Sequence, residues 1–172
     1  MPTDIRDIIT PELERNIEVF RTLLEGLTEE VYHWRFLEGK WTLLEIVCHL
    51  YDEERDDFRT RVKHTLETPL VAMSPIDPAG WVLSREYPRQ NFDEKLKLFL
   101  SERKKSVEWL RILKDPIWDN TYHHPSLGPL TASMFLANWL AHDYLHIRQI
   151  MRLKYEYTKA KTGENLNYAG AW

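Results

Sequence analysis

Hydrophobic side chains recur at steps of three and four residues over four long segments of this chain. That spacing is typical of amphipathic helices, each of which buries one face. The predicted helices run from about Thr10 to Gly26, Trp41 to Leu66, Asn91 to Leu113 and Thr131 to Tyr155. Because no segment alternates as a strand does, the pattern predicts an all-α fold, most simply a four-helix bundle.

The residues at the ends of these segments carry start and stop signals. Thr10 is the expected N-cap of the first helix, and Pro11 is expected at its first helical position, where an amide hydrogen would stay unpaired in any case. Gly26 is expected to end that helix. A short helical turn is expected over residues 28–32, before the second helix begins.

The lengths of the connections limit how the helices can be arranged. A short link between the first two helices suits antiparallel neighbours, whereas the long connection from about Thr68 to Gln90 lets the second and third run parallel. The predicted bundle is therefore up-down-down-up. Residues 1–172 are expected to form one domain, in which residues 161–172 are a polar C-terminal tail.

The composition narrows the class of protein. With 23 basic and 27 acidic residues and a formal charge of −4, the chain lacks the electrostatic footprint of a nucleic-acid-binding protein. No segment has the length and apolarity of a membrane span, and the N-terminus lacks the features of a secretory signal. The single cysteine, Cys48, forms no internal disulfide, so we expect a cytoplasmic protein with a buried thiol and a small-molecule substrate.

Seven Trp and eight Tyr residues are many for a chain of this length. Such side chains suit an aromatic-rich core, which is the simpler interpretation, but also pocket walls and subunit interfaces. A homodimer is therefore compatible with the composition.

Two histidines of the fourth helix occupy its apolar stripe. His142 and His146 are four residues apart, so both rings lie on one helix face, in line with Trp139 and Ile150. Burying these polar rings costs free energy unless their nitrogens have partners. The pair therefore either binds a metal or forms hydrogen bonds in the core, and the spacing alone leaves both interpretations open.

A third ligand is needed to close a metal site, and His49 of the second helix is the candidate. It follows the apolar Ile46 by three residues, which places it near the inner face. Three imidazoles leave coordination positions open for water or substrate, as in catalytic sites, and they suit zinc, nickel, iron or copper. Glu53, four residues further on, is a candidate partner of a ligand, fourth ligand or general base; the alternative is a solvated acid in the charged run 52–57.

The other candidate residues have simpler interpretations. Asp143 could orient a histidine ring, but a helix-surface acid is the simpler prediction. Cys48 and His49 point about 100° apart on a helix, which argues against a Cys/His catalytic pair. The four remaining histidines are expected at the surface, where one in a loop could border the mouth of the site; they are His33, His64, His123 and His124.

With these residues in place, the chain resembles the DinB/YfiT-like superfamily of metal-dependent bundle proteins. The matching features, in chain order, are Trp41-Thr42 with Glu45, His49-Leu50 with Glu53, the helix from Asp93 to Arg103, the loop from Pro125 to Thr131, and the run from His142 to Ile150. The resemblance spans nearly the whole chain. It implies an up-down-down-up bundle, a divalent metal held by His49, His142 and His146, and frequent dimers.

The resemblance also implies a kind of chemistry. Characterised members include bacillithiol S-transferases and mycothiol-dependent isomerases, in which a metal activates a low-molecular-weight thiol. We therefore expect a metal-dependent enzyme with thiol S-transferase-type chemistry and zinc or nickel, or else iron, as its metal. Two alternatives stay open: a metal-dependent hydrolase, and a non-catalytic stress-response bundle whose metal joins two helices. Four aromatic residues are candidates for an apolar wall over the metal: Trp41, Trp81, Tyr87 and Trp139.

Overall fold

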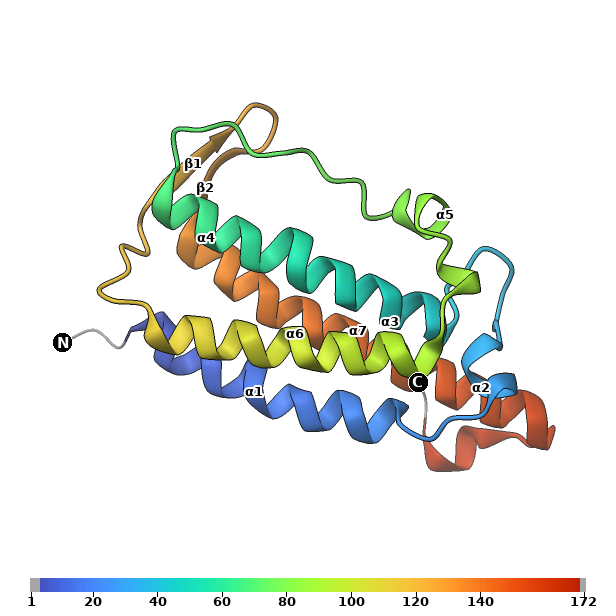
Figure 1. Cartoon of the computed structure of the whole chain (residues 1–172). Coiled ribbons are helices and arrows are strands. Elements are labelled where there is room, and N and C mark those ends of the chain that lie inside the picture. The colour runs from blue at the N-terminus through green and yellow to red at the C-terminus, as the bar shows by residue number, and fades with distance from the viewer. Residues whose placement is uncertain (1–3, 171–172) are drawn as a thin grey trace.

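Four long helical segments pack side by side in the computed structural model, which describes residues 4–170 (Figure 1). They are α1 (Ile5–Leu24), the continuous segment α3 (Leu43–Asp52), η1 (Glu53–Phe58) and α4 (Arg59–Glu67), then α6 (Phe92–Ile112) and α7 (Ala132–Thr162). The shorter elements are α2 (Glu29–His33), α5 (Trp81–Ser84), η2 (Tyr87–Arg89), β1 (Thr121–His124), β2 (Gly128–Thr131) and η3 (Leu166–Ala169). The predicted helical bundle is confirmed.

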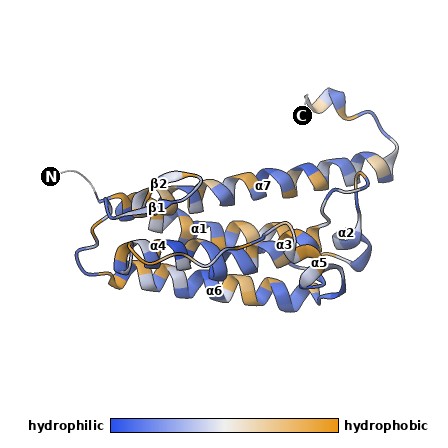
Figure 2. Cartoon of the chain, turned by 90° about the horizontal axis from the view of Figure 1, so that it is seen from above, coloured by the Kyte–Doolittle hydropathy of each residue, from blue (hydrophilic) through white to orange (hydrophobic). Residues whose placement is uncertain are grey.

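The directions of the helices follow from the contacts between them. Asn16 of α1 donates to Asp143 of α7, and further along both helices Lys154 donates to the Leu23 carbonyl. These two helices therefore run in the same direction. Figure 1 shows that α3–α4 and α6 run in the opposite direction, so the order along the chain is up-down-down-up. The connection between α4 and α6 runs along the length of the bundle, from the end that carries the hairpin back to the end where α3 begins (Figure 2).

Two hydrophobic clusters fill the interior, and a polar layer separates them. The larger cluster includes Phe20, Leu44 and Phe99. The smaller one includes Leu13, Val62 and Leu136. Along α1, η1, α6 and α7, the polar layer is made by Asn16, Glu54, Arg103, Asp143 and His146, all of which are buried. Polar side chains in the interior are stable only where they are hydrogen-bonded or bind a ligand, so this layer is the natural place for a functional site.

Helix α1 begins earlier than the Thr10-Pro11 pair predicts. The N-cap is Asp4, whose carboxylate accepts a hydrogen bond from the amide of Arg6 at 2.8 Å. Pro11 consequently lies inside the helix and Thr10 is buried. The prediction was wrong because an earlier cap adds more than a full turn that buries Ile9, which compensates for the hydrogen bond that Pro11 cannot donate.

A β-hairpin precedes α7, although the sequence analysis found no strand. Its strands β1 and β2 pair antiparallel, with Thr121 opposite Thr131 and His124 opposite Gly128. Four-residue strands are too short to show the alternation that predicts a strand. The α7 helix is also longer than predicted: it continues to Thr162 and ends at Gly163, whose φ of 70° is the left-handed conformation of a helix C-terminus.

The long connection carries structure of its own, in the form of α5 and η2. Tyr122 of the hairpin anchors it, because its hydroxyl accepts a hydrogen bond from the amide of Met73. Within residues 4–170, no helix has the length and apolarity needed to cross a membrane.

Thr42 and Glu45 define the start of the helix that carries His49, and they form a capping box. Thr42 Oγ1 accepts from the amide of Glu45 at 3.2 Å, and the Glu45 carboxylate accepts from the amide of Thr42 at 2.6 Å. The substitution Thr42→Ala removes the side-chain acceptor. We expect it to lower the free energy of unfolding by about 1 kcal/mol, measured by urea titration. Thr42→Ser, which keeps the hydroxyl, is the control and should have nearly the stability of the wild type; equal losses in both variants would contradict the cap assignment.

Candidate metal centre

Three histidines from two antiparallel helices meet in the polar layer. His49 lies near the end of α3, and His142 and His146 lie on successive turns of α7. The Nε2 atom of His142 is 3.2 Å from that of His49 and 3.0 Å from that of His146. One nitrogen from each ring lies within 4.8 Å of the other two. The pair His142 and His146, predicted from their spacing on α7, therefore lies beside His49, the third ligand predicted on α3.

Burial keeps these three rings neutral. It lowers the pKa of His49 to about 3, with a further contribution from His146. Burial, then His146 and His49, lower the pKa of His142 to about 2. Burial also lowers the pKa of His146, which Gln149 and Asp143 oppose. At neutral pH all three rings therefore have a nitrogen lone pair available for a cation.

The geometry of the three nitrogens fits one divalent cation. Nitrogen ligands at about 2.0–2.1 Å from a single ion lie roughly 3.0–3.4 Å from one another, which matches the two Nε2 separations. Without an ion, the same two contacts would be N–H···N hydrogen bonds between neighbouring rings. The remaining ring nitrogens of His49 and His146 are buried and have no hydrogen-bond partner, so hydrogen bonds within the protein satisfy at most one nitrogen of each of these two rings.

Two aromatic rings border the histidines. The ring centroid of Trp41 is 4.7 Å from that of His49, and its plane is within 3° of parallel to His146. On the other side, the ring of Phe58 is 4.9 Å from His142. Trp41 is therefore placed as the sequence analysis predicted, as an apolar wall beside the site.

The other three aromatic candidates make contacts away from the histidines. Trp139 is stacked against Phe58 in the smaller cluster. The Tyr87 hydroxyl donates to Asp52 at 2.7 Å. The Trp81 ring lies under the guanidinium of Arg85.

A turn of π-helix lets one continuous helix present both His49 and Phe58 to α7. At about 100° per residue, nine residues of regular α-helix would place Phe58 on the side opposite His49. The wider turns of η1 remove most of that difference. The sequence analysis predicted an uninterrupted helix here, because the charged run 52–57 has no breaker that signals a π-turn.

Glu53 lies in the same π-turn, and the interpretation as a solvated acid is wrong. Its side chain is buried, and its Oε1 atom has no hydrogen-bond partner. Burial, then the neighbouring Asp57, raise its pKa to about 9, which favours the protonated form of the carboxyl group. Glu53 is not among the groups whose ligand atoms meet within 4.8 Å, which in residues 4–170 are the three histidines.

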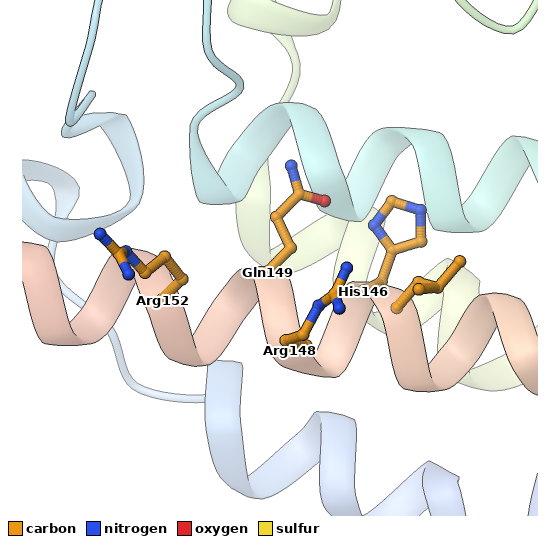
Figure 3. A pocket seen from close by; sticks show the side chains of 5 residues that line it. His146, Arg148, Gln149 and Arg152 are labelled. Carbon is orange, nitrogen blue, oxygen red and sulfur yellow. The ribbon is translucent and has the colours of Figure 1, made fainter. Parts of the chain in front are cut away.

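A surface groove reaches the site along α7. Its volume is about 450 Å³, and Leu145, His146, Arg148, Gln149 and Arg152 line it. Figure 3 shows the side chains of His146 and Gln149 extending from α7 toward α3. A small molecule in this groove would therefore meet His146 directly, with an amide and guanidinium groups beside it.

Asp143 is not on the helix surface, where the sequence analysis placed it. It is completely buried, and its carboxylate accepts hydrogen bonds from Arg103 at 2.5 and 2.7 Å and from Asn16 at 2.8 Å. Arg103 also binds Glu54, at 2.9 and 3.0 Å from its Nε. We call Glu54, Arg103 and Asp143 the Arg103 cluster. It joins η1, α6 and α7 by charged hydrogen bonds, and α1 through Asn16.

The sequence analysis missed Arg103 and Glu54, although a signal for Arg103 was present. Arg103 follows Leu100 by three residues and precedes Val107 by four, so it occupies the apolar stripe of its helix. A charge on such a stripe indicates a buried partner. For Glu54 no such signal existed, since the π-turn changes which residues of the helix face inward.

The remaining histidines and the cysteine lie outside the metal centre. His33 and His123 are exposed, as predicted. His64 contacts the Val71 carbonyl at 2.8 Å, and Nδ1 of His124 accepts two amide hydrogens in the hairpin turn, so both have structural partners. Cys48 is buried, and burial raises the pKa of its thiol to about 12, in agreement with the predicted inert thiol.

Comparisons with known proteins identify a family and two relatives of this chain. A family model described as the DinB superfamily matches residues 12–150. A protein of Oceanobacillus iheyensis named "Putative metal-dependent hydrolase" is 26% identical over 157 residues, which cover 87% of this chain and 88% of that protein. YfiT of Bacillus subtilis, named in the same way, is 25% identical over 132 residues, which cover 76% of this chain and 73% of YfiT.

The solved structure of YfiT from Bacillus subtilis is described as a probable metal-dependent hydrolase with an unusual four-helix bundle topology. It matches with a TM-score of 0.77 and 22% sequence identity, over 93% of this chain and 89% of that one. At this identity the match shows the shared fold.

The site predicts that His49→Ala loses its metal. Protein prepared without an affinity tag and incubated with zinc or nickel should retain close to one ion per chain, and the variant almost none, because two imidazoles hold a divalent ion weakly. Elemental analysis after gel filtration measures this. His64→Ala is the matched control, since His64 lies on the same helical segment away from the site, and it should retain the metal. Full retention by His49→Ala would contradict the ligand assignment.

Proposed function

The chain belongs to the DinB superfamily, and we propose that it is a metal-dependent enzyme in which His49, His142 and His146 hold one divalent cation. The convergence of three neutral histidines, of which His49 and His146 are buried and His142 is half-buried, carries this proposal. Imidazole ligands favour zinc or nickel, and iron is compatible with them.

A divalent cation with three protein ligands keeps open positions, where it lowers the pKa of a small nucleophile at neutral pH. The residues around the site have complementary tasks. Trp41 and Phe58 exclude water from two sides of the histidines. The groove along α7 admits the substrate, and Arg148 and Gln149 can donate hydrogen bonds to its polar groups.

The chain supplies no thiol nucleophile of its own. The only thiol of the protein, Cys48, is buried with a pKa raised to about 12, so it is protonated at neutral pH. We propose a low-molecular-weight thiol as the first candidate. It would lose its proton, and its sulfur would form a bond to an electrophilic carbon as the leaving group departs with the bonding electrons, which is S-transferase chemistry.

Water is the second candidate, and it would make the protein a hydrolase. The names of the two relatives favour it, and so does Glu53. The pKa of this buried carboxyl group is raised, and the group lies one turn after His49, where it can serve as the acid that protonates a leaving group.

We further propose a homodimer in a reducing cytoplasm. The single buried cysteine is compatible with that compartment. Tyr144, Leu145 and Met151 expose apolar surface along the outer face of α7, which suits a contact with a second chain.

One assay separates the two nucleophiles. Zinc- or nickel-loaded protein is mixed with chlorodinitrobenzene and with nitrophenyl esters, each with and without a small thiol such as cysteine or coenzyme A. We expect conjugation of the chloroarene that requires both the thiol and His142, so the His142→Ala variant should be inactive. Ester hydrolysis without thiol, reduced at least tenfold in Glu53→Gln, would instead support the hydrolase. Absence of turnover with both substrate classes would contradict the proposal that the protein is an enzyme.

A further inference from the structure

The Arg103 cluster carries an unbalanced charge in the interior of the bundle. One guanidinium and two carboxylates give it a net charge of −1, and Glu54, Arg103 and Asp143 are each at most 1% exposed. Its remaining hydrogen-bond partners are neutral: the side chains of Asn16 and Trp139 and the Leu13 carbonyl. An uncompensated charge in the interior costs free energy even where every hydrogen bond is made.

A purely structural role does not require this charge. An arginine paired with one carboxylate would also join two helices and would leave the interior neutral. Here Arg103 has a second carboxylate, on a third helical segment. The extra negative charge therefore calls for a compensating positive charge in the neighbourhood.

The neutral histidine site is that neighbourhood. Asp143 directly follows His142 in α7, and Trp139, which donates to Glu54 at 2.9 Å, precedes His142 by three residues. This adjacency puts the cluster and the histidines within electrostatic reach of each other.

We propose that the Arg103 cluster is the charge partner of the metal site, and that its net negative charge raises the affinity of the three histidines for a divalent cation without contacting it. The inference rests on the proposed metal site. Glu54 and Asp143 act as positioning residues, because they work through the electrostatic field and through the orientation of α7. A cation at the histidines changes the net charge of the whole polar layer from −1 to +1.

The test removes one negative charge without changing shape. Glu54→Gln keeps a side-chain oxygen for Trp139 and turns the cluster neutral. The dissociation constant for zinc, measured by competition with a chromophoric chelator, should rise on the order of tenfold or more relative to the wild type. The difference should persist in high salt, since buried charges are only weakly screened.

Two control variants distinguish the effect of charge beside the site from a charge change elsewhere and from a loss of core packing. Glu14→Gln makes the same charge change on an exposed position of α1 and should leave zinc affinity unchanged. Val107→Ala removes buried volume one turn from Arg103, so it should lower the melting temperature of the metal-free protein without changing zinc affinity.

The outcomes are distinguishable. Wild-type affinity in folded Glu54→Gln, or an equal loss of affinity in Val107→Ala, would overturn the inference. If Glu54→Gln does not fold, Asp143→Asn makes the same change from α7 and is judged by the same criteria. Failure of the wild type itself to bind zinc, nickel or iron would contradict the proposed metal site instead.

Discussion

The burial of Arg103 between Glu54 and Asp143 is the interaction on which the rest of the structure depends. Removing three charges from water costs free energy, and the hydrogen bonds of all three side chains offset part of this desolvation cost. Loss of either carboxylate leaves buried N–H groups of the guanidinium without an acceptor. Only one rotation of α6, α7 and η1 about their own axes satisfies these hydrogen bonds. Other rotations would leave a buried charged group without a partner.

The rotation that satisfies these hydrogen bonds also places the histidines. His142 and Asp143 are neighbours on α7, so the rotation that turns Asp143 to Arg103 brings His142 and His146 to face α3. On the opposite helix, the π-turn lets Glu54 reach Arg103 while His49 still faces α7. The three histidines and the charged cluster are thus two parts of one polar layer, held between two hydrophobic clusters that fix its position along the bundle.

The sequence was sufficient for features that depend on a regular helical period. The histidines on the apolar stripes of two helices could be identified because 3.6-residue periodicity determines which side chains face inward. The sequence was insufficient for segments that depart from a regular helix, and for side chains whose hydrogen-bond partner lies far away in the chain. The hairpin is too short for a pattern, η1 breaks the period, and the burial of Asp143 depends on Arg103, 40 residues away. For Glu53 the sequence left a role at the site and a solvated acid both open, because its charged neighbours suggested solvent, and the structure shows that its side chain is buried.

X-ray absorption spectroscopy of the zinc-loaded protein tests the central claim most directly, because it reports the atoms bound to the metal. The structure predicts three imidazole nitrogens at about 2.0–2.1 Å, with the remaining positions filled by oxygen from solvent and no sulfur. A spectrum with sulfur scattering, or one fitted by a single imidazole and several oxygens, would contradict a centre built from His49, His142 and His146.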